Sequence, residues 1–269
     1  MNRISTFKKE MNDDVLVITR QDNIALVGLN KSKTLNALSK DLTESLERTF
    51  NSLQEDPQVK VVIIYSKVDK AFCAGADIKA FHNQSYSDMM LSDNLSKLRT
   101  VFQIITKPVI ACVNRLALGG GFELALNCDI IICDKDCRFG LPEIKLGLFP
   151  SLGGTLIAKT IGRHAANYYI MTGEFIPAIE AERMGIVQIV EETPDLALKR
   201  SIEIAKKIEQ FSLYSLISAK KAVKVSFEES GSLARDIEKN TFNALFDTKG
   251  SKEGVRAFIE KRKADFADK

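Results

Sequence analysis

The stretch LALGGGFELALNCDIIIC, residues 116–133, decides how this chain is organised. Three consecutive glycines, Gly119, Gly120 and Gly121, separate a short apolar run from an apolar helical pattern, and DIIIC closes the stretch as a strand. The first backbone N–H groups of a helix have no intrahelical acceptor. The glycines are therefore a candidate site for a negatively charged oxygen.

Glu123 is the only charged residue between Arg115 and Asp129. A helix that buries the neighbouring Leu and Ala residues also buries this carboxylate, and an isolated buried carboxylate is costly. Two interpretations stay open: Glu123 is an acid–base group, or it makes a capping contact at a helix N-terminus.

Apolar runs on both sides of this stretch predict a largely parallel sheet with helical crossovers, and hence an α/β fold. Ser39 is expected to cap a helix that reaches about residue 53. The expected strands are residues 15–20, 24–30, 59–66, 108–113 and 129–133.

From about residue 194 the strand signals disappear, and apolar residues recur at helical spacing among many charges. We therefore expect an α/β core with the site over residues 1–193, and a helical extension over residues 194–269 that serves in oligomerisation. The expected helices of this extension are residues 196–210, 213–227, 233–246 and 252–263.

Composition excludes several classes of protein. The chain has 269 residues, of which 45% are hydrophobic and 27% charged, as in globular proteins that bury a core. Its 38 basic and 35 acidic residues leave a formal charge of +3, too small a bias for a dedicated nucleic-acid binder. The first ten residues lack an apolar segment and no run of 18 apolar residues occurs, which disfavours secretion and membrane spanning.

The five cysteines are an odd number without a C-x-x-C pair, and only two histidines accompany them. A structural zinc site is therefore not expected. Several cysteines lie in apolar runs, which indicates reduced, buried thiols in a reducing compartment.

Two further segments carry candidate residues. FGLPEIKLGLFPSLGGT, residues 139–155, places Glu143 in an irregular Gly/Pro-rich loop, and two carboxylates in apolar loops suit general acid–base work. AFCAGADIKAF, residues 71–81, offers small residues beside a strand end, with Asp77 positioned to cap a helix. Taken alone, Glu143 is also explained as a surface residue and residues 71–81 as a plain strand-to-helix turn.

Competing motifs are absent. Leu124 stands where a dinucleotide fingerprint needs its third glycine, and there is no phosphate-binding G-x-x-x-x-G-K-[ST]. Ser151 has Phe149 where a nucleophile elbow needs glycine, which disfavours serine hydrolysis.

Together these segments resemble the enoyl-CoA hydratase/isomerase, or crotonase, family. LNKSKTLNALS, AFCAGADIK, KPVIACVNRLALGGGFELA, FGLPEIKLGLFPSLGGT and EGVRAFIEKRKADF follow one another in the family's order over nearly the whole chain. The resemblance implies a crotonase-like spiral of ββα units with C-terminal helices, assembled as a homotrimer or a homohexamer.

The resemblance also implies a site. The oxyanion hole would be the backbone N–H groups of Ala76 and Gly120, which hold the thioester oxygen of an acyl-CoA. Ala76, Asp77, Ile78 and Lys79 would line the coenzyme A moiety. No metal or redox cofactor is implied, because coenzyme A enters as part of the substrate. The expected location is the cytoplasm, or the mitochondrial matrix in a eukaryote.

Hydratases of this family carry two glutamates, at the positions of Glu123 and Glu143, whereas its isomerases generally keep one at or near the second. The pair implies an enoyl-CoA hydratase that adds water reversibly to trans-2-enoyl-CoA, in fatty-acid β-oxidation or related acyl-CoA metabolism. The alternative is a Δ3,Δ2-enoyl-CoA isomerase. A remote alternative is an RNA-binding homologue that uses the lysines of residues 220–224 and 261–263, and an inactive scaffold is less favoured still.

Three positions depart from the family's pattern. Arg115 stands where a glycine is usual, so that a positive φ there would be strained. Ser151 replaces a glycine near the expected catalytic water. Lys31 and Ser32 replace an Arg-Pro pair near the coenzyme A. The wall that sets acyl chain length is expected within residues 87–106, and the sequence does not define the length.

Overall fold

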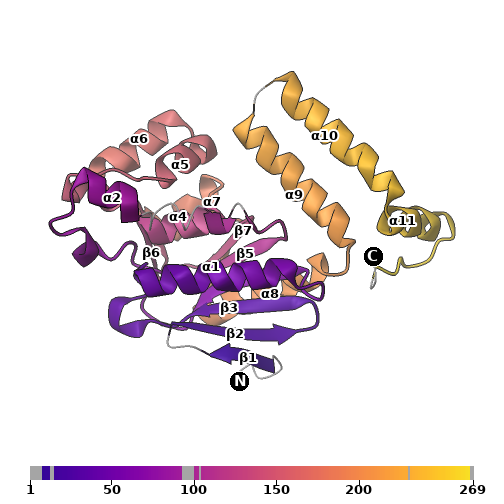
Figure 1. Cartoon of the computed structure of the whole chain (residues 1–269), viewed down its shortest axis with the longest axis horizontal. Coiled ribbons are helices and arrows are strands. Elements are labelled where there is room, and N and C mark those ends of the chain that lie inside the picture. The colour runs from indigo at the N-terminus through magenta and orange to yellow at the C-terminus, as the bar shows by residue number, and fades with distance from the viewer. Residues whose placement is uncertain (1–7, 13–14, 93–99, 103, 230, 267–269) are drawn as a thin grey trace.

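The computed structural model describes residues 8–12, 15–92, 100–102, 104–229 and 231–266. In these residues one large sheet has the strand order β1-β2-β3-β4-β5-β7-β10 (Figure 1). Its first three strands pair antiparallel, and every later neighbour pairs parallel, as the apolar runs predict. The strands are β1 (Lys8–Asn12), β2 (Leu16–Gln21), β3 (Ile24–Leu29), β4 (Val61–Ser66), β5 (Val109–Val113), β7 (Ile130–Asp134) and β10 (Ile189–Glu191).

A second, three-stranded sheet was not predicted from the sequence. It has the order β6-β8-β9 within the described residues and is built from β6 (Leu116–Leu118), β8 (Arg138–Gly140) and β9 (Ile176–Pro177). These strands have only two or three residues each, so they carry no readable alternation. The sheet holds the glycine stretch beside residues 138–140.

Both faces of the large sheet are buried, which explains the continuous apolar runs. Val62 and Ile64 of β4 pack into the core that includes α1 (Lys40–Glu55). Val61 and Ile63 face the opposite way and pack with α8 (Pro194–Ile208). Other helices that the described residues of the body form are α2 (Tyr86–Ser92), α4 (Gly120–Leu126), α5 (Gly153–Ile161), α6 (Arg163–Thr172), α7 (Ala178–Arg183) and the short 3₁₀ helices η2 (Ser32–Thr34), η3 (Ile78–Phe81) and η4 (Pro142–Leu146).

The C-terminal region is all-helical, as predicted. It continues with α9 (Leu213–Glu228), α10 (Ser232–Ala244), η5 (Leu245–Asp247) and α11 (Lys249–Ile259), which project from the body in Figure 1. The described residues of α9 and α10 include none that is buried. The helical region begins at α8, close to the expected boundary at residue 194, but α8 covers the sheet and so belongs to the body by its packing.

The cysteines are all free thiols, and four of the five are buried. Burial raises the pKa of the Cys73 and Cys112 thiols to about 12, which keeps them protonated and unreactive. No helix among the described residues is long and apolar enough to cross a membrane.

Candidate active site

The glycine stretch forms the turn from β6 into α4. Gly119 has φ +50° and ψ −127°, a conformation that residues with a side chain rarely adopt. A Cβ at Gly121 would lie 2.3 Å from the carbonyl oxygen of Cys73. The absence of side chains therefore permits the turn and lets the start of α4 pack directly on residues 73–76.

This packing brings two backbone N–H groups together. A Cβ at Gly120 would lie 3.7 Å from the nitrogen of Ala76, and both residues line the same cavity. Gly120 is the first residue of α4, where an N–H has no intrahelical acceptor. Neither N–H donates to another group in the part of the chain that the structure describes. The two N–H groups that the resemblance singled out thus belong to residues that line one cavity, and neither is engaged by another described group.

Glu123 lies one turn into α4, with only 2% of its surface exposed. Its Oε1 accepts hydrogen bonds from the N–H groups of Leu152 (2.9 Å) and Gly153 (2.7 Å), at the N-terminus of α5. The carboxylate also lines the cavity. The capping contact considered from the sequence is therefore present, but it is made to a later helix, and Glu123 faces the cavity as well.

Glu143 lies in η4 and is half-buried in the wall of the same cavity. Its Oε2 is buried without a hydrogen-bond partner among the described residues. Burial, reinforced by the charge of Glu123, raises the pKa of Glu143 above its usual value. A carboxyl group with a raised pKa and a free oxygen is suited to giving and taking a proton.

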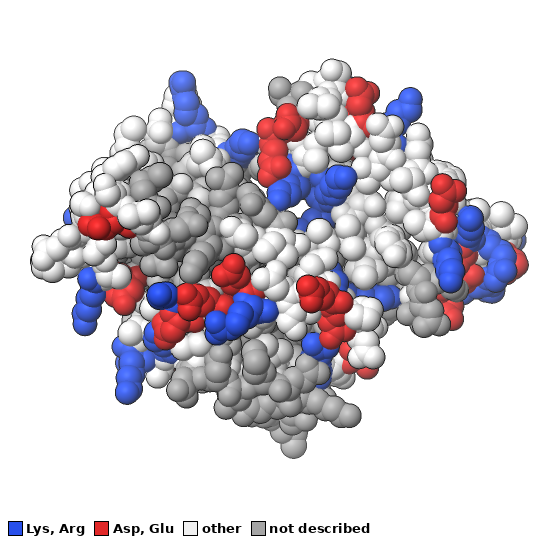
Figure 2. Space-filling view, viewed as in Figure 1, with Lys and Arg blue, Asp and Glu red and all other residues white. Residues whose placement is uncertain are grey.

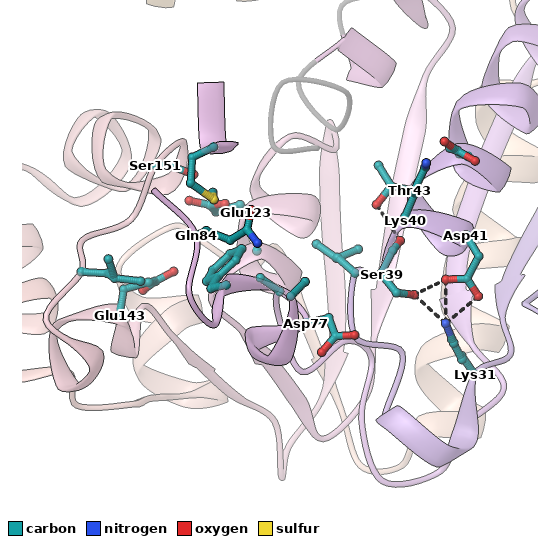
Figure 3. Close-up of a pocket in the computed structure, with 18 of the residues that line it drawn as sticks. Lys31, Ser39, Lys40, Asp41, Thr43, Asp77, Gln84, Glu123, Glu143 and Ser151 are labelled. Carbon is teal, nitrogen blue, oxygen red and sulfur yellow. Dashed lines mark hydrogen bonds and ion pairs between the residues drawn. The ribbon is translucent and has the colours of Figure 1, made fainter. Parts of the chain in front are cut away.

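The cavity has a volume of about 900 Å³, large enough for a sizeable organic ligand. Figure 3 shows the side chains of Glu123, Glu143, Gln84 and Ser151 toward one end and Lys31 with its partners toward the other. Apolar wall is contributed by Leu38, Ala80, Phe81, Met89, Leu148 and Phe149. Part of the wall expected within residues 87–106 lies outside the described residues.

The segment after Ala76 is only partly in the cavity. Asp77 lines it and caps η3 by accepting from the N–H of Lys79 at 3.2 Å, which confirms the predicted cap. Ile78 and Lys79 are exposed and do not belong to the cavity lining. Their expected contact with coenzyme A stays a prediction.

The departures at Arg115 and Ser151 have visible outcomes. Arg115 adopts φ +54°, so the positive φ expected at this position is present. The turn is held by the Arg115 N–H, which donates to Asp134 at 3.0 Å, and by an ion pair with Asp136 at 2.6 Å. Ser151 lines the cavity near Glu123 (Figure 3).

One cluster at the cavity was not anticipated. Lys31, Ser39 and Asp41 form a hydrogen-bonded group (Figure 3). Ser39 does precede α1 as predicted, but its hydroxyl makes no cap hydrogen bond to the helix. The prediction of a side-chain cap is therefore wrong, because the hydroxyl is engaged by Lys31 and Asp41 instead. No sequence pattern indicates this arrangement.

Other site chemistries find little support in the described residues. They contain no group of three or more His, Cys, Asp or Glu side chains that would hold a metal ion. Lys220 pairs with Asp129 at 2.8 Å and Lys224 with Glu228 at 3.9 Å, so these lysines do not form an unopposed basic face. Figure 2 shows Lys and Arg interleaved with Asp and Glu on the face that it displays.

Comparison with known proteins identifies the family of the chain. The sequence model of the enoyl-CoA hydratase/isomerase family matches residues 19–269. A probable enoyl-CoA hydratase of Rhizobium meliloti is 38% identical over 257 residues, which cover 95% of this chain and 99% of that protein. A probable mitochondrial enoyl-CoA hydratase of Dictyostelium discoideum is 40% identical over 244 residues, 90% of this chain and 87% of that protein.

A solved structure gives the same result for the fold. The crystal structure of an enoyl-CoA hydratase from Bacillus anthracis superposes with a TM-score of 0.86 at 30% sequence identity. The match covers 98% of this chain and 100% of that chain. The crotonase-like fold expected from the sequence is confirmed.

Proposed function

Because this chain belongs to the enoyl-CoA hydratase/isomerase family, we propose that it is an enoyl-CoA hydratase, a hydro-lyase that adds water reversibly to trans-2-enoyl-CoA. The product is a 3-hydroxyacyl-CoA, formed by syn addition. The observation that carries this proposal is the meeting of two carboxylates, Glu123 and Glu143, with two N–H donors in one cavity.

The N–H groups of Ala76 and Gly120 act as the oxyanion hole. They donate hydrogen bonds to the thioester carbonyl oxygen and withdraw electron density from C3 of the double bond. As water attacks C3, negative charge builds on this oxygen in an enolate, and fixed donors stabilise the charge without reorganising. Loss of one such donor typically costs about 10²–10³ in kcat.

The two glutamates hold one water between them. Glu123 is oriented by the Leu152 and Gly153 N–H groups and presents its other oxygen to the water. Glu123 takes a proton from the water as the water oxygen bonds to C3, and the protonated Glu143 gives a proton to C2 on the same face. Water thus supplies the hydroxyl group at C3 and one proton to Glu123, and Glu143 supplies the proton at C2. Transfer of one proton from Glu123 back to Glu143 restores the starting state. In dehydration the two carboxyl groups exchange roles.

The chemistry proposed is neutral in redox and uses no metal, because N–H donors and carboxyl groups supply the polarisation and the proton transfers. Coenzyme A enters only as part of the acyl-CoA thioester. We place the reaction in fatty-acid β-oxidation or related acyl-CoA metabolism. The location proposed is the cytoplasm, or the mitochondrial matrix for a eukaryotic source.

The second candidate is a Δ3,Δ2-enoyl-CoA isomerase that uses Glu143 alone. The hydrogen bonds of Glu123 to the start of α5 favour it, because they give Glu123 a structural task that needs no chemistry. The two activities leave different products, so one experiment separates them.

The test is a turnover screen with trans-2-enoyl-CoAs of increasing chain length, beginning with crotonyl-CoA, and with 3-enoyl-CoAs in parallel. Hydration yields 3-hydroxyacyl-CoA, which chromatography detects with a mass 18 Da above the substrate. Interconversion of 3-enoyl and 2-enoyl thioesters without any hydroxyacyl product replaces the hydratase by the isomerase. Activity with neither class contradicts both.

We also propose that the chain assembles as a homotrimer or a homohexamer through its C-terminal helices. Large apolar side chains remain exposed there, including Phe242 (59%), Phe258 (85%) and Ile259 (73%). Exposed apolar groups gathered on one region are typical of protein–protein interfaces. Light scattering at micromolar concentration should give a mass three or six times 29.9 kDa, and a monomer mass contradicts the proposal.

A further inference from the structure

We call the end of the cavity that is lined by Lys31, Ser39 and Asp41 the cavity mouth. An ion pair and a hydrogen bond there occupy all three N–H donors of the Lys31 ammonium group. The Lys31 Nζ lies 2.7 Å from Asp41 Oδ1, 2.6 Å from Asp41 Oδ2 and 2.6 Å from Ser39 Oγ (Figure 3). An ammonium group has three N–H donors, and here three protein oxygens lie within hydrogen-bond distance of it. A new acceptor therefore reaches Lys31 only by displacing one of them.

The group is held from both sides. The Lys31 backbone N–H donates to Asn36 Oδ1 at 2.7 Å, which fixes where the lysine side chain begins. Ser39 stands at the N-cap of α1 yet gives the helix no cap hydrogen bond, and instead its hydroxyl bonds to Asp41. A Ser at this position ordinarily stabilises its helix. The hydroxyl thus contributes to the cavity mouth rather than to the helix.

The balance of charge at the mouth is unusual for a site that takes a polyanion. Among the described residues the cavity lining has only two cations, Lys31 and Lys40, and besides the two glutamates of the site it has three acids, Asp41, Glu44 and Asp77. This step rests on the proposed function: with the thioester held at Ala76 and Gly120, the phosphates of coenzyme A extend toward the mouth. The negative charge of Asp41 then opposes the phosphates, and Asp41 holds Lys31.

Asp41 remains ionised in this setting. Partial burial would raise its pKa, but hydrogen bonds from Lys31 and Ser39 and the charge of Lys31 outweigh that effect and lower it. The side chains of Lys31 and Asp41 are 23% and 54% exposed, and ion pairs in contact with solvent contribute little net stability.

We propose that Asp41 limits the affinity for coenzyme A by competing with its phosphates for Lys31. The pair opens when a phosphate binds, and the repulsion by Asp41 holds the affinity for coenzyme A below what the same cavity would reach without it. Asp41 then lowers the affinity for the acyl-CoA substrate and takes no part in the chemical step.

The test is isothermal titration calorimetry with free coenzyme A, which needs no turnover. Asp41→Asn should tighten the Kd by about three- to tenfold at 50 mM salt, and the gain should shrink at 500 mM salt, where screening is strong. Lys31→Met should weaken binding by less than about twofold in the wild-type background but by about fivefold in Asp41→Asn. Asp41→Ser repeats the test, because the side-chain amide of Asn can still accept a hydrogen bond from Lys31 and the shorter Ser side chain removes that amide.

A matched control is Glu192→Gln. Glu192 pairs with Lys135 at 2.6 Å, both side chains are more than half exposed, and neither lines the cavity. The Kd of Glu192→Gln for coenzyme A should equal that of the wild type. A second readout is the KM for crotonyl-CoA, which should also fall in Asp41→Asn. The KM for the N-acetylcysteamine thioester, which lacks phosphates, should not follow it.

The outcomes separate the two claims. If the wild type hydrates crotonyl-CoA but Asp41→Asn leaves the Kd unchanged or weakens it, competition is refuted and the proposed function stands. If Asp41→Asn tightens binding equally with and without Lys31, the effect is simple repulsion and the competition for Lys31 is again refuted. If the wild type neither binds coenzyme A nor turns over any enoyl-CoA, the proposed function fails and this inference fails with it.

Discussion

Glu123 joins the chemistry of the cavity to the start of α5, and two substitutions at this residue separate the two roles. Gln keeps an oxygen that accepts from the Leu152 and Gly153 N–H groups but loses the negative charge. Ala loses both. We expect Glu123→Gln to fold and to lose about 10²–10⁴ in kcat, the usual contribution of an acid–base group. Glu123→Ala should lose kcat and stability together.

The loss of stability follows from the two hydrogen bonds. A buried N–H left without an acceptor costs about 1–3 kcal/mol, and the Leu152 N–H, being only partly buried, lies at the low end. Glu123→Ala should thus destabilise by about 2–4 kcal/mol. At about 2–4 °C per kcal/mol for a chain near this size, Tm falls by about 4–16 °C. Glu123→Gln should lower Tm by only a few degrees.

The assay pairs crotonyl-CoA hydration with thermal unfolding of the same samples. Asp134→Ala is the matched control: Asp134 is fully buried and accepts from the Arg115 and Asp136 N–H groups at 3.0 Å, but it does not line the cavity. It should lower Tm while kcat stays near the wild-type value. If Glu123→Gln keeps full kcat and loses only stability, Glu123 is a structural contact and the isomerase becomes the activity to test.

Three further predictions concern the same site. Combining Glu123→Gln with Glu143→Gln should be little worse than the poorer single variant, because both groups act in the addition of the same water molecule. Losses in kcat that multiply would contradict a shared water. Burial and the charge of Glu123 raise the pKa of Glu143, so kcat for hydration should fall as the pH rises through that pKa, because the protonated acid is lost. In Glu123→Gln the fall in kcat should come at lower pH. A pH profile that does not move counts against the electrostatic coupling of the two glutamates. Gly121→Ala should destabilise the protein by about 1–3 kcal/mol, because the added Cβ clashes with the backbone of Cys73. The control is Gly154→Ala in helix α5, where no atom lies near the added Cβ, and it should stabilise the protein by about 0.5–1 kcal/mol. Equal Tm values for the two variants would refute the close packing at Gly121.

The sequence predicts those features that depend on neighbours in the chain. The apolar runs of β4 and β5 indicate strands buried on both faces, and the structure confirms them. Asp77 caps η3 as predicted, because its partner is the N–H two residues later. The glycine turn is equally local, since its positive φ requires a glycine at position 119 itself.

Features that depend on distant partners were not predictable. The N–H groups that hold Glu123 come from 29 and 30 residues further along the chain, so only the folded chain shows which side of the carboxylate is free. The hydroxyl of Ser39 is drawn away from its helix by a lysine eight residues earlier. The short strands β6, β8 and β9 exist only because they pair with one another.

The bond between Glu123 and the start of α5 also limits how such a chain can change over generations. A lineage that gave up this carboxylate, as a move from hydration to isomerisation would allow, also loses the acceptor for the Leu152 and Gly153 N–H groups. The acid–base role of residue 123 is then dispensable, but an oxygen that accepts these two hydrogen bonds is still needed. The accessible first steps are replacements such as Gln, which retain the acceptor, and smaller residues become tolerable only after the loop before α5 has found another partner.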